Sequence, residues 1–369
     1  MIINLLDPGL LQIEGHHLEW DRRIAAELIA QGHELTVYGH AGITPEVCAK
    51  FPDPIKLVPL FRNYSYFDPL KLDPVAGELL GFLDVAAMLA QDLRATAKAD
   101  LWLWPSLFQA QLYACALIKP DAPIAGCIHV EPGFRSSQGG AYWKYAFIKA
   151  RQAGLRMNLG VSGPILQEEY CELVGNRQFV KSLPLPVPGC PGGAPRPGLK
   201  TVGFFGHQRQ EKGAELVPLL VSMLLREGYQ VVLHDSGNAF GGERIPGLTR
   251  LGYVPDLAAE IAKCDLVVVP YEAESYRSRE SSIVWEAMAS GVPVVVPYGT
   301  APALRVLTSG AGKVFHFPTV DSIYSAFAEA KANYEQIAAG AFQASQQWRQ
   351  THGTEKLVQA LTRLPSASR

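Results

Sequence analysis

The sequence predicts an α/β protein built from two domains, each with a doubly wound parallel sheet. Buried apolar runs alternate with segments of helical periodicity along the whole chain, a pattern typical of parallel sheets covered by helices. Six prolines and four glycines between residues 183 and 200 interrupt that pattern, because they fit neither a helix nor a central strand. The length of 369 residues suits two domains. We therefore predict a first domain at 1–185, a linker at 186–200 and a second domain from 201 to 349.

Composition excludes several classes of protein. Charged residues make up 18% of the chain and the formal net charge is -2, which argues against a general nucleic-acid binder. The six cysteines are scattered without a CxxC pair, so neither a zinc site nor a disulfide framework is expected, and a reducing compartment fits. We expect no metal.

The chain lacks the signals of export and membrane insertion. Its first residues carry no basic leader and enter a strand directly, and no uncharged apolar run is long enough to span a bilayer. We expect a soluble cytoplasmic protein. Contact with the inner face of a membrane stays open, because segment 140–157 combines four basic residues with four aromatic ones on an expected helix.

The first half alternates between the two kinds of element. We expect strands at 2–6, 35–38, 99–104, 124–130 and 159–162, and helices at 20–30, 75–98, 108–117, 140–157 and 164–174. Segment 54–74 is expected to be irregular, and its aromatic residues either pack on the core or line an acceptor pocket.

Three histidines lie where parallel sheets form their sites. His16 and His17 follow Gly15 in the loop after the first strand, where they either bind phosphate or sugar hydroxyls or stay exposed. His129 lies at the carboxyl end of an expected central strand. Taken alone, it is more often a hydrogen-bonded turn residue than a functional one.

The second half repeats the alternation. We expect strands at 201–205, 230–234, 248–253, 266–269 and 292–296, and helices at 214–227, 257–263, 283–289, 323–344 and 355–364. Neither G-x-G-x-x-G nor a Walker A pattern occurs, so NAD binding and P-loop ATP chemistry are unsupported.

Segment 271–298 reads as a charged loop, a helix and a strand after a buried strand. Ser281 or Ser282 can cap the helix, and its free N–H groups and dipole would then favour an anion. An ordinary strand–helix–strand unit with a solvated loop is the alternative.

The run WEAMASGVPVVV resembles the donor-site segment of retaining GT-B glycosyltransferases, the large nucleotide-sugar-dependent family with a Glu-x7-Glu motif (family 4-like). Glu286 matches the second Glu of that motif, and Ser278 stands where the first is expected. The resemblance implies two Rossmann-like domains facing across a cleft, with a C-terminal helix at 350–369 packing back on the first domain.

The loop GHQRQEKG is similar to the Gly-Arg…Lys-Gly loop that binds the donor diphosphate in this family. Lys212 matches the family's lysine, whereas the family's Arg falls on His207, with Arg209 close enough to substitute.

By the same resemblance, His129 contacts the transferred sugar, and Glu286 accepts from the ribose. The implied catalytic residues are His129, Arg209, Lys212 and Glu286. The implied donor-binding residues are Gly15, Gly206, His207, Tyr253, Val254, Ser278, Glu280, Ser281, Ser282, Ile283 and Glu286.

The activity implied is a metal-independent, hexosyl-type transfer from a nucleotide-diphosphate sugar with retention of configuration. The nucleotide sugar is a substrate, so no cofactor is expected. The acceptor is a sugar, lipid or protein that the sequence does not specify.

Two alternatives come from other classes. A non-catalytic nucleotide-sugar-binding scaffold is favoured slightly by Ser278 and His207, and it would bind nucleotide without turnover. A sugar-nucleotide epimerase on a similar fold would need carboxylate acid and base groups, for which Glu131 is a candidate.

Overall fold

The computed structural model divides into two compact units. Unit 1 holds Met1–Pro186 and Thr354–Arg369, and unit 2 holds Val187–Gly353. The chain thus leaves the first unit at Pro186 and returns to it at Thr354. The structure describes all residues except 14–16, 52, 66–76, 135, 137, 177–178, 188–194, 196, 236, 238–239, 243, 253, 255 and 364–369.

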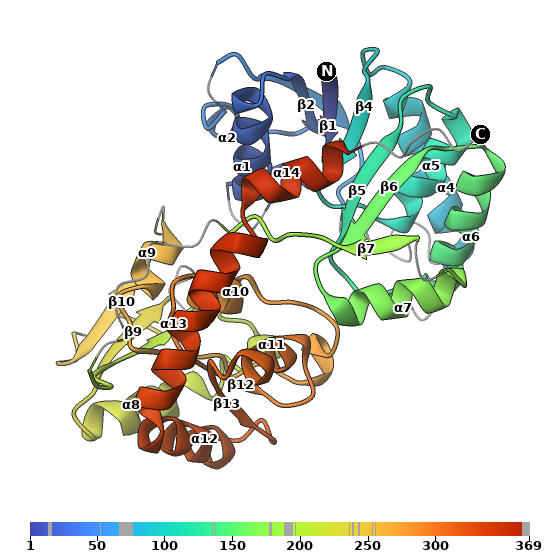
Figure 1. The fold of residues 1–369 in the computed structure, drawn as a ribbon. Coiled ribbons are helices and arrows are strands. Elements are labelled where there is room, and N and C mark those ends of the chain that lie inside the picture. The colour runs from blue at the N-terminus through green and yellow to red at the C-terminus, as the bar shows by residue number, and fades with distance from the viewer. Residues whose placement is uncertain are drawn as a thin grey trace. The chain divides into compact units, whose positions relative to one another are not determined.

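Unit 1 contains a seven-stranded sheet in the order β3-β2-β1-β4-β5-β6-β7, in which every pair is parallel (Figure 1). Its strands are β1 (Ile2–Leu6), β2 (Glu34–His40), β3 (Lys56–Phe61), β4 (Leu101–Trp104), β5 (Ile124–Ile128), β6 (Met157–Val161) and β7 (Val180–Ser182). The strand order reverses between β1 and β4, so the carboxyl ends of these neighbours form the usual place for a ligand.

Helices cover both faces of this sheet. They are α1 (His17–Ala30), α2 (Pro45–Cys48), α4 (Gly77–Leu93), α5 (Gln109–Ile118), α6 (Gly139–Gln152), α7 (Pro164–Val174) and the returning α14 (Thr354–Thr362). One apolar core joins the sheet to α4, α5, α6 and α7, and the other joins it to α1 and α14.

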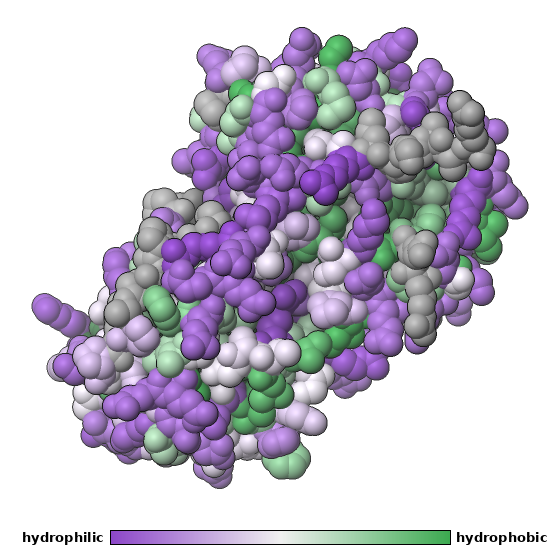
Figure 2. Space-filling model, viewed as in Figure 1, coloured by the Kyte–Doolittle hydropathy of each residue, from purple (hydrophilic) through white to green (hydrophobic). Residues whose placement is uncertain are grey.

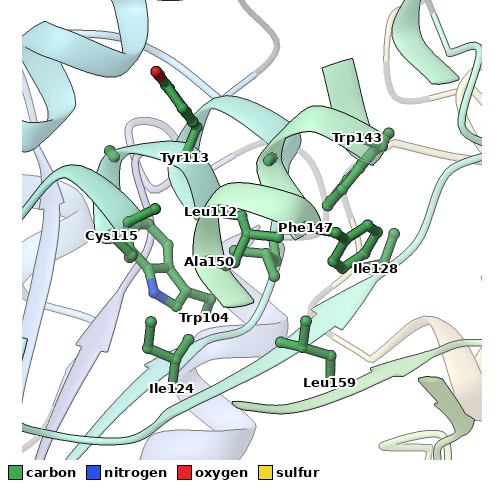
Figure 3. Packing of buried hydrophobic residues seen from close by; sticks show 14 of the residues in the cluster. Trp104, Leu112, Tyr113, Cys115, Ile124, Ile128, Trp143, Phe147, Ala150 and Leu159 are labelled. Carbon is green, nitrogen blue, oxygen red and sulfur yellow. The ribbon is translucent and has the colours of Figure 1, made fainter. Parts of the chain in front are cut away.

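In the core under α5 and α6, the regularly spaced apolar residues of helices and strands pack against one another (Figure 3). Trp104 and Leu159 extend from strands toward Leu112 of α5 and Phe147 of α6. Trp143 and Phe147 are each 1% exposed, so α6, the helix with the basic and aromatic residues, directs these rings into the core. They are therefore unavailable to a lipid surface.

Unit 2 contains a six-stranded, fully parallel sheet in the order β10-β9-β8-β11-β12-β13. Its strands are β8 (Thr201–Phe204), β9 (Gln230–His234), β10 (Leu248–Leu251), β11 (Leu266–Val268), β12 (Val294–Pro297) and β13 (Gly312–Phe315). Its helices are η1 (Gln210–Lys212), α8 (Val217–Arg226), α9 (Leu257–Ile261), η2 (Glu274–Tyr276), α10 (Ser282–Ala289), α11 (Ala301–Ser309), α12 (Val320–Ala332) and α13 (Tyr334–Thr351).

The structure confirms the predicted fold class and corrects several elements. The expectation of an irregular segment at 54–74 was wrong for its first part, since Lys56–Phe61 forms β3. Pro59 is tolerated there because β3 is an edge strand. The expected helix at 323–344 is two helices, which meet at Asn333. Strands β7 and β13 and helix α11 were not predicted.

Among the described residues, no helix combines the length and apolar character needed to cross a membrane. Hydrophilic residues cover most of the face shown in Figure 2, and hydrophobic residues appear on it in smaller groups.

Candidate functional site

The predicted phosphate loop connects β8 to α8 in unit 2, and two glycines give it its shape. Gly206 has a φ of 102° and Gly213 a φ of 70°, both in the region that favours glycine. A Cβ on Gly213 would lie 2.0 Å from the carbonyl oxygen of Pro270. The loop can therefore pack closely against the segment after β11. Since β8 and β11 are the neighbours at which the strand order reverses, this loop lies where such sheets bind ligands.

Lys212 is half-buried at the end of this loop. Its Nζ lies 5.3 Å from the centroid of the Tyr271 ring and 3.2 Å from the position that a Cβ on Gly206 would take. Burial lowers the pKa of the ammonium. Within the described residues, no carboxylate forms a salt bridge with Lys212. An ammonium that is partly desolvated without an ion pair is costly, and a bound anion would remove that cost.

The start of α10 lies beside the same tyrosine. Ser281 is buried and its hydroxyl oxygen accepts from the main-chain N–H of Val284 at 3.4 Å, which makes it the helix cap. Its hydroxyl also lies 3.5 Å from the Tyr271 hydroxyl. Ile283, in the first turn, lies 3.5 Å from the Cβ position of Gly206. The free N–H groups of α10 are thus grouped with Lys212 around Gly206 and Tyr271.

Two tyrosines in contact and an arginine complete this part of unit 2. The rings of Tyr271 and Tyr276 lie 4.2 Å apart, and the Arg279 guanidinium lies 4.9 Å from the Tyr276 centroid. Burial raises the pKa of each phenol to about 12, so both hydroxyls stay protonated and can donate. Lysine, guanidinium, phenol and helix N-terminus together form an environment suited to phosphate.

Glu280 has a partner of its own. Its carboxylate is 2% exposed and pairs with Arg305 of α11 at 2.7 Å, and it also accepts from Trp285 Nε1 at 2.9 Å. The Glu280 carboxylate is thus already engaged by side chains of unit 2 itself. Ser278 and Glu286 are buried at 3% and 9% exposure.

The other predicted donor residues differ in their exposure. Arg209 is 60% exposed and lies 3.8 Å from Glu211, so it is available at the surface. His207 and Val254 are half-buried, and Ser282 is exposed. Gly15 and Tyr253 lie outside the described residues.

Unit 1 holds an imidazole–carboxylate pair at the carboxyl end of β1. The Nδ1–H of His17 donates to Asp7 Oδ2 at 2.6 Å, and the main-chain N–H of Gly9 donates to Asp7 Oδ1 at 2.7 Å. His17 is 5% exposed and opens α1, so the alternative of an exposed loop histidine was wrong. A Cβ on Gly9 would stand 2.2 Å from the ring, which only glycine avoids. The bond to Asp7 fixes the tautomer and leaves Nε2 as the basic nitrogen of the neutral ring.

Asp21 and His129 lie close to this pair. Asp21 is fully buried, and burial together with the charge of Asp7 raises the pKa of its carboxyl well above the usual range. His129 donates from Nε2 to the Pro105 carbonyl at 2.7 Å and packs edge-on against Trp20 at 4.7 Å. Burial lowers the pKa of His129 to about 4, so this imidazole is neutral near pH 7.

Sequence reasoning missed Asp7, Asp21, Tyr271 and Arg279. The position of Asp7, directly after the first strand and before a Pro-Gly pair, was the available signal. The sequence carries no comparable signal for Asp21, because Asp21 has the place of an ordinary helix residue. Among the described residues, no group of three or more His, Cys, Asp or Glu side chains is suited to a metal ion.

The comparisons with known proteins agree with the architecture. Residues 200–332 match the family model described as glycosyl transferases group 1. The fold is the GT-B fold. A search of curated proteins found no match to the chain.

Three similar solved structures illustrate the shared fold. The glycotransferase of kitacinnamycin is 20% identical with a TM-score of 0.64, over 99% of each chain. The sucrose-phosphate synthase from Thermosynechococcus elongatus is 14% identical with a TM-score of 0.66, over 97% of this chain and 96% of its own. The glycosyltransferase VinC in complex with DTDP is 16% identical with a TM-score of 0.60, over 98% of this chain and 99% of its own.

Proposed function

We propose that this protein is a glycosyltransferase that moves a sugar from a nucleotide-diphosphate sugar to an acceptor hydroxyl. Unit 2 would hold the donor, with the diphosphate between Lys212 and the capped start of α10. The family match over 200–332 and the DTDP bound by VinC support this assignment.

The observation that carries the proposal is the half-buried ammonium of Lys212, which has no salt bridge among the described residues and lies beside a helix N-terminus at the sheet's switch point. A departing nucleoside diphosphate supplies the missing negative charge. Lys212 and the α10 amides would stabilise that charge as it develops, which is an electrostatic contribution to catalysis. Arg209 and Arg279 would add to it from the neighbouring loops.

Retention of configuration and independence of metal are proposed from the resemblance of the donor segment. The Asp7–His17 pair favours a second stereochemical course, since an imidazole held by a carboxylate is suited to deprotonate an acceptor hydroxyl for direct displacement. The anomeric configuration of the first product, read by NMR, distinguishes retention from inversion. Activity in the presence of a chelator tests the need for a metal.

The proposal is tested by thermal shift with UDP, GDP, ADP, dTDP and CDP. A nucleotide present at about 100 times its dissociation constant should stabilise the chain by about 2.7 kcal/mol. One base should give the largest shift, and Lys212→Ala should abolish it. Lys263→Ala is the matched control, because this lysine is 65% exposed and pairs with Glu260 on α9.

Each outcome separates the rival functions. No shift with any of these nucleotides would overturn the proposal. A shift without turnover of any matching sugar donor would favour the scaffold. Conversion of one nucleotide sugar into its epimer, without an acceptor, would favour the epimerase.

A further inference from the structure

Unit 1 has a partly open cavity of about 60 Å³ at the carboxyl edge of its sheet. Fifteen described residues line it, from the segments that follow β1, β3, β4 and β5 and from helices α4, α5 and α6. A single bound water needs a volume of at least about 10 to 15 Å³ on the same measure. The cavity therefore has room for roughly four to six waters. That is the scale of one six-membered ring.

One wall of the cavity is aromatic and rigid. The rings of Phe82 and Tyr142 stack with their centroids 4.7 Å apart and their planes 7° apart. Both side chains are buried, at 2% and 7% exposure, and Val85 and Leu89 continue this wall along α4. Such a wall gains most from contact with the apolar face of a ring.

The opposite side carries a few placed polar groups. The Gln111 amide donates to the Ser65 hydroxyl at 3.4 Å, and Ser65 lies 3.5 Å from Asp7 Oδ1. These contacts connect the cavity to the Asp7–His17 pair. Asn63 is 8% exposed, and its Nδ2 has no hydrogen-bond partner within the described part of the chain. A buried amide N–H without a partner is costly, and an oxygen on a bound molecule would satisfy it.

The charge of the lining restricts the ligand further. Glu78 contributes a carboxyl, and no lysine, arginine or histidine is among the fifteen lining residues. The charge of Glu78 adds to burial in raising the pKa of Tyr142, so that phenol also stays neutral. A phosphate or carboxylate would meet the Glu78 carboxyl in this cavity, and no cation among its described lining residues would pair with it.

We propose that this cavity binds the acceptor, and that the acceptor is a neutral, ring-bearing hydroxyl compound rather than a phosphorylated lipid, an acidic molecule or a sugar chain. This inference rests on the proposed function for its role as acceptor site. The ring lies against the Phe82 wall, and an oxygen accepts from Asn63 Nδ2. The hydrogen-bonded contacts through Ser65 place the hydroxyl end of the compound on the Asp7 side.

The test measures binding to the full-length chain without any donor. Saturation-transfer NMR at about pH 7 compares 4-methylphenol with three probes, namely 4-hydroxybenzoate, phenyl phosphate and glucose. We expect transfer to 4-methylphenol and none to the other three. Asn63→Ala should weaken 4-methylphenol binding by roughly 2- to 10-fold, the effect of one lost hydrogen bond.

Two further variants locate the binding. Ala110→Phe should abolish the signal by filling the cavity, whereas Leu117→Phe, on the same helix at a 45% exposed position, should keep it. Glu78→Lys should admit 4-hydroxybenzoate, a gain that a misfolded variant cannot give.

Preference for glucose or phenyl phosphate, or 4-methylphenol binding that survives Ala110→Phe, would overturn the inference. The nucleotide panel is independent of this measurement. Phenol binding without any nucleotide shift would refute the transferase and leave the cavity as a site for a neutral phenol without the role of acceptor site. A nucleotide shift without phenol binding would keep the transferase and refute the cavity as its acceptor site.

Discussion

At the scale of single residues, the two units differ in whether a partly or fully buried charged group has an ionic partner within the described part of the protein. Lys212 in unit 2 is partly withdrawn from water without an ion pair among the described residues, which marks a place for an external anion. Asp7 in unit 1 is fully buried but receives donors from His17 and Gly9, so its charge is compensated internally. We expect the first arrangement to bind a ligand, whereas the second positions an imidazole.

Lys212→Met should raise the free energy of unfolding of the ligand-free chain while it removes nucleotide binding. The lowered pKa means that the charged ammonium destabilises the fold near neutral pH, and the contact with Tyr271 offsets only part of this. We expect a gain of about 0.5 to 2 kcal/mol, the usual size for relief of a functional strain. Urea denaturation measures it, and a loss of stability would assign Lys212 a structural role.

Asp21→Asn should stabilise the chain near pH 7, with a gain that shrinks toward pH 4. An unfolded aspartate loses its proton near about pH 3.9, whereas the buried carboxyl keeps its proton to higher pH. The native chain therefore loses stability as pH rises above that value, by about 1.4 kcal/mol for each unit of raised pKa. Asparagine removes this dependence. Denaturation at several pH values measures this dependence, and Asp84→Asn, at an exposed position, is the control. If stability changes with pH equally in Asp21→Asn and the native chain, the prediction is wrong.

At the scale of elements, helix starts and glycine turns position the candidate donor site. Ser281 caps α10, and Gly213 allows the Lys212 loop to pack against Pro270. Because the loop and the helix follow neighbouring strands of one sheet, their placement depends on packing within unit 2 alone.

Ser281→Ala should destabilise unit 2 by about 0.5 to 2 kcal/mol through loss of the helix cap. It should also reduce the nucleotide-induced thermal shift, because the amides of α10 would be less well ordered. Ser282→Ala, at an exposed neighbouring position, is the control for both effects. Equal behaviour of the two variants in urea denaturation and thermal shift would remove α10 from the proposed site.

At the scale of the whole molecule, the chain passes from unit 1 to unit 2 and back. The return segment α14 packs in unit 1 on the core that contains α1. Asn158 on β6 fixes its end, since its amide donates to the carbonyls of Ala360 at 2.8 Å and Leu361 at 3.0 Å. A residue near the middle of the sequence thus holds the C-terminal helix in place.

Asn158→Ala should destabilise unit 1 by about 1 to 3 kcal/mol, because it leaves buried helix-end carbonyls without donors. Gln359→Ala on the exposed side of α14 is the control, since its amide donates to the exposed Glu355 on the same helix. Urea denaturation followed by tryptophan fluorescence measures the difference. Equal stability of the two variants would show that α14 is held by apolar packing alone.

The sequence by itself determined the fold class, and it singled out the linker region and the Lys212 and Ser281 segments as candidates. The spacing of apolar residues, the glycine turns and the helix caps are local signals, so they can be recognised without knowing which elements pack together. Only the tertiary structure placed β3 on the sheet edge, paired Glu280 with Arg305 and grouped Asp7, His17 and Asp21. Those contacts join elements that are separate in the sequence, and packing, not local pattern, chooses the partners. The roles of the grouped residues in catalysis stay predictions.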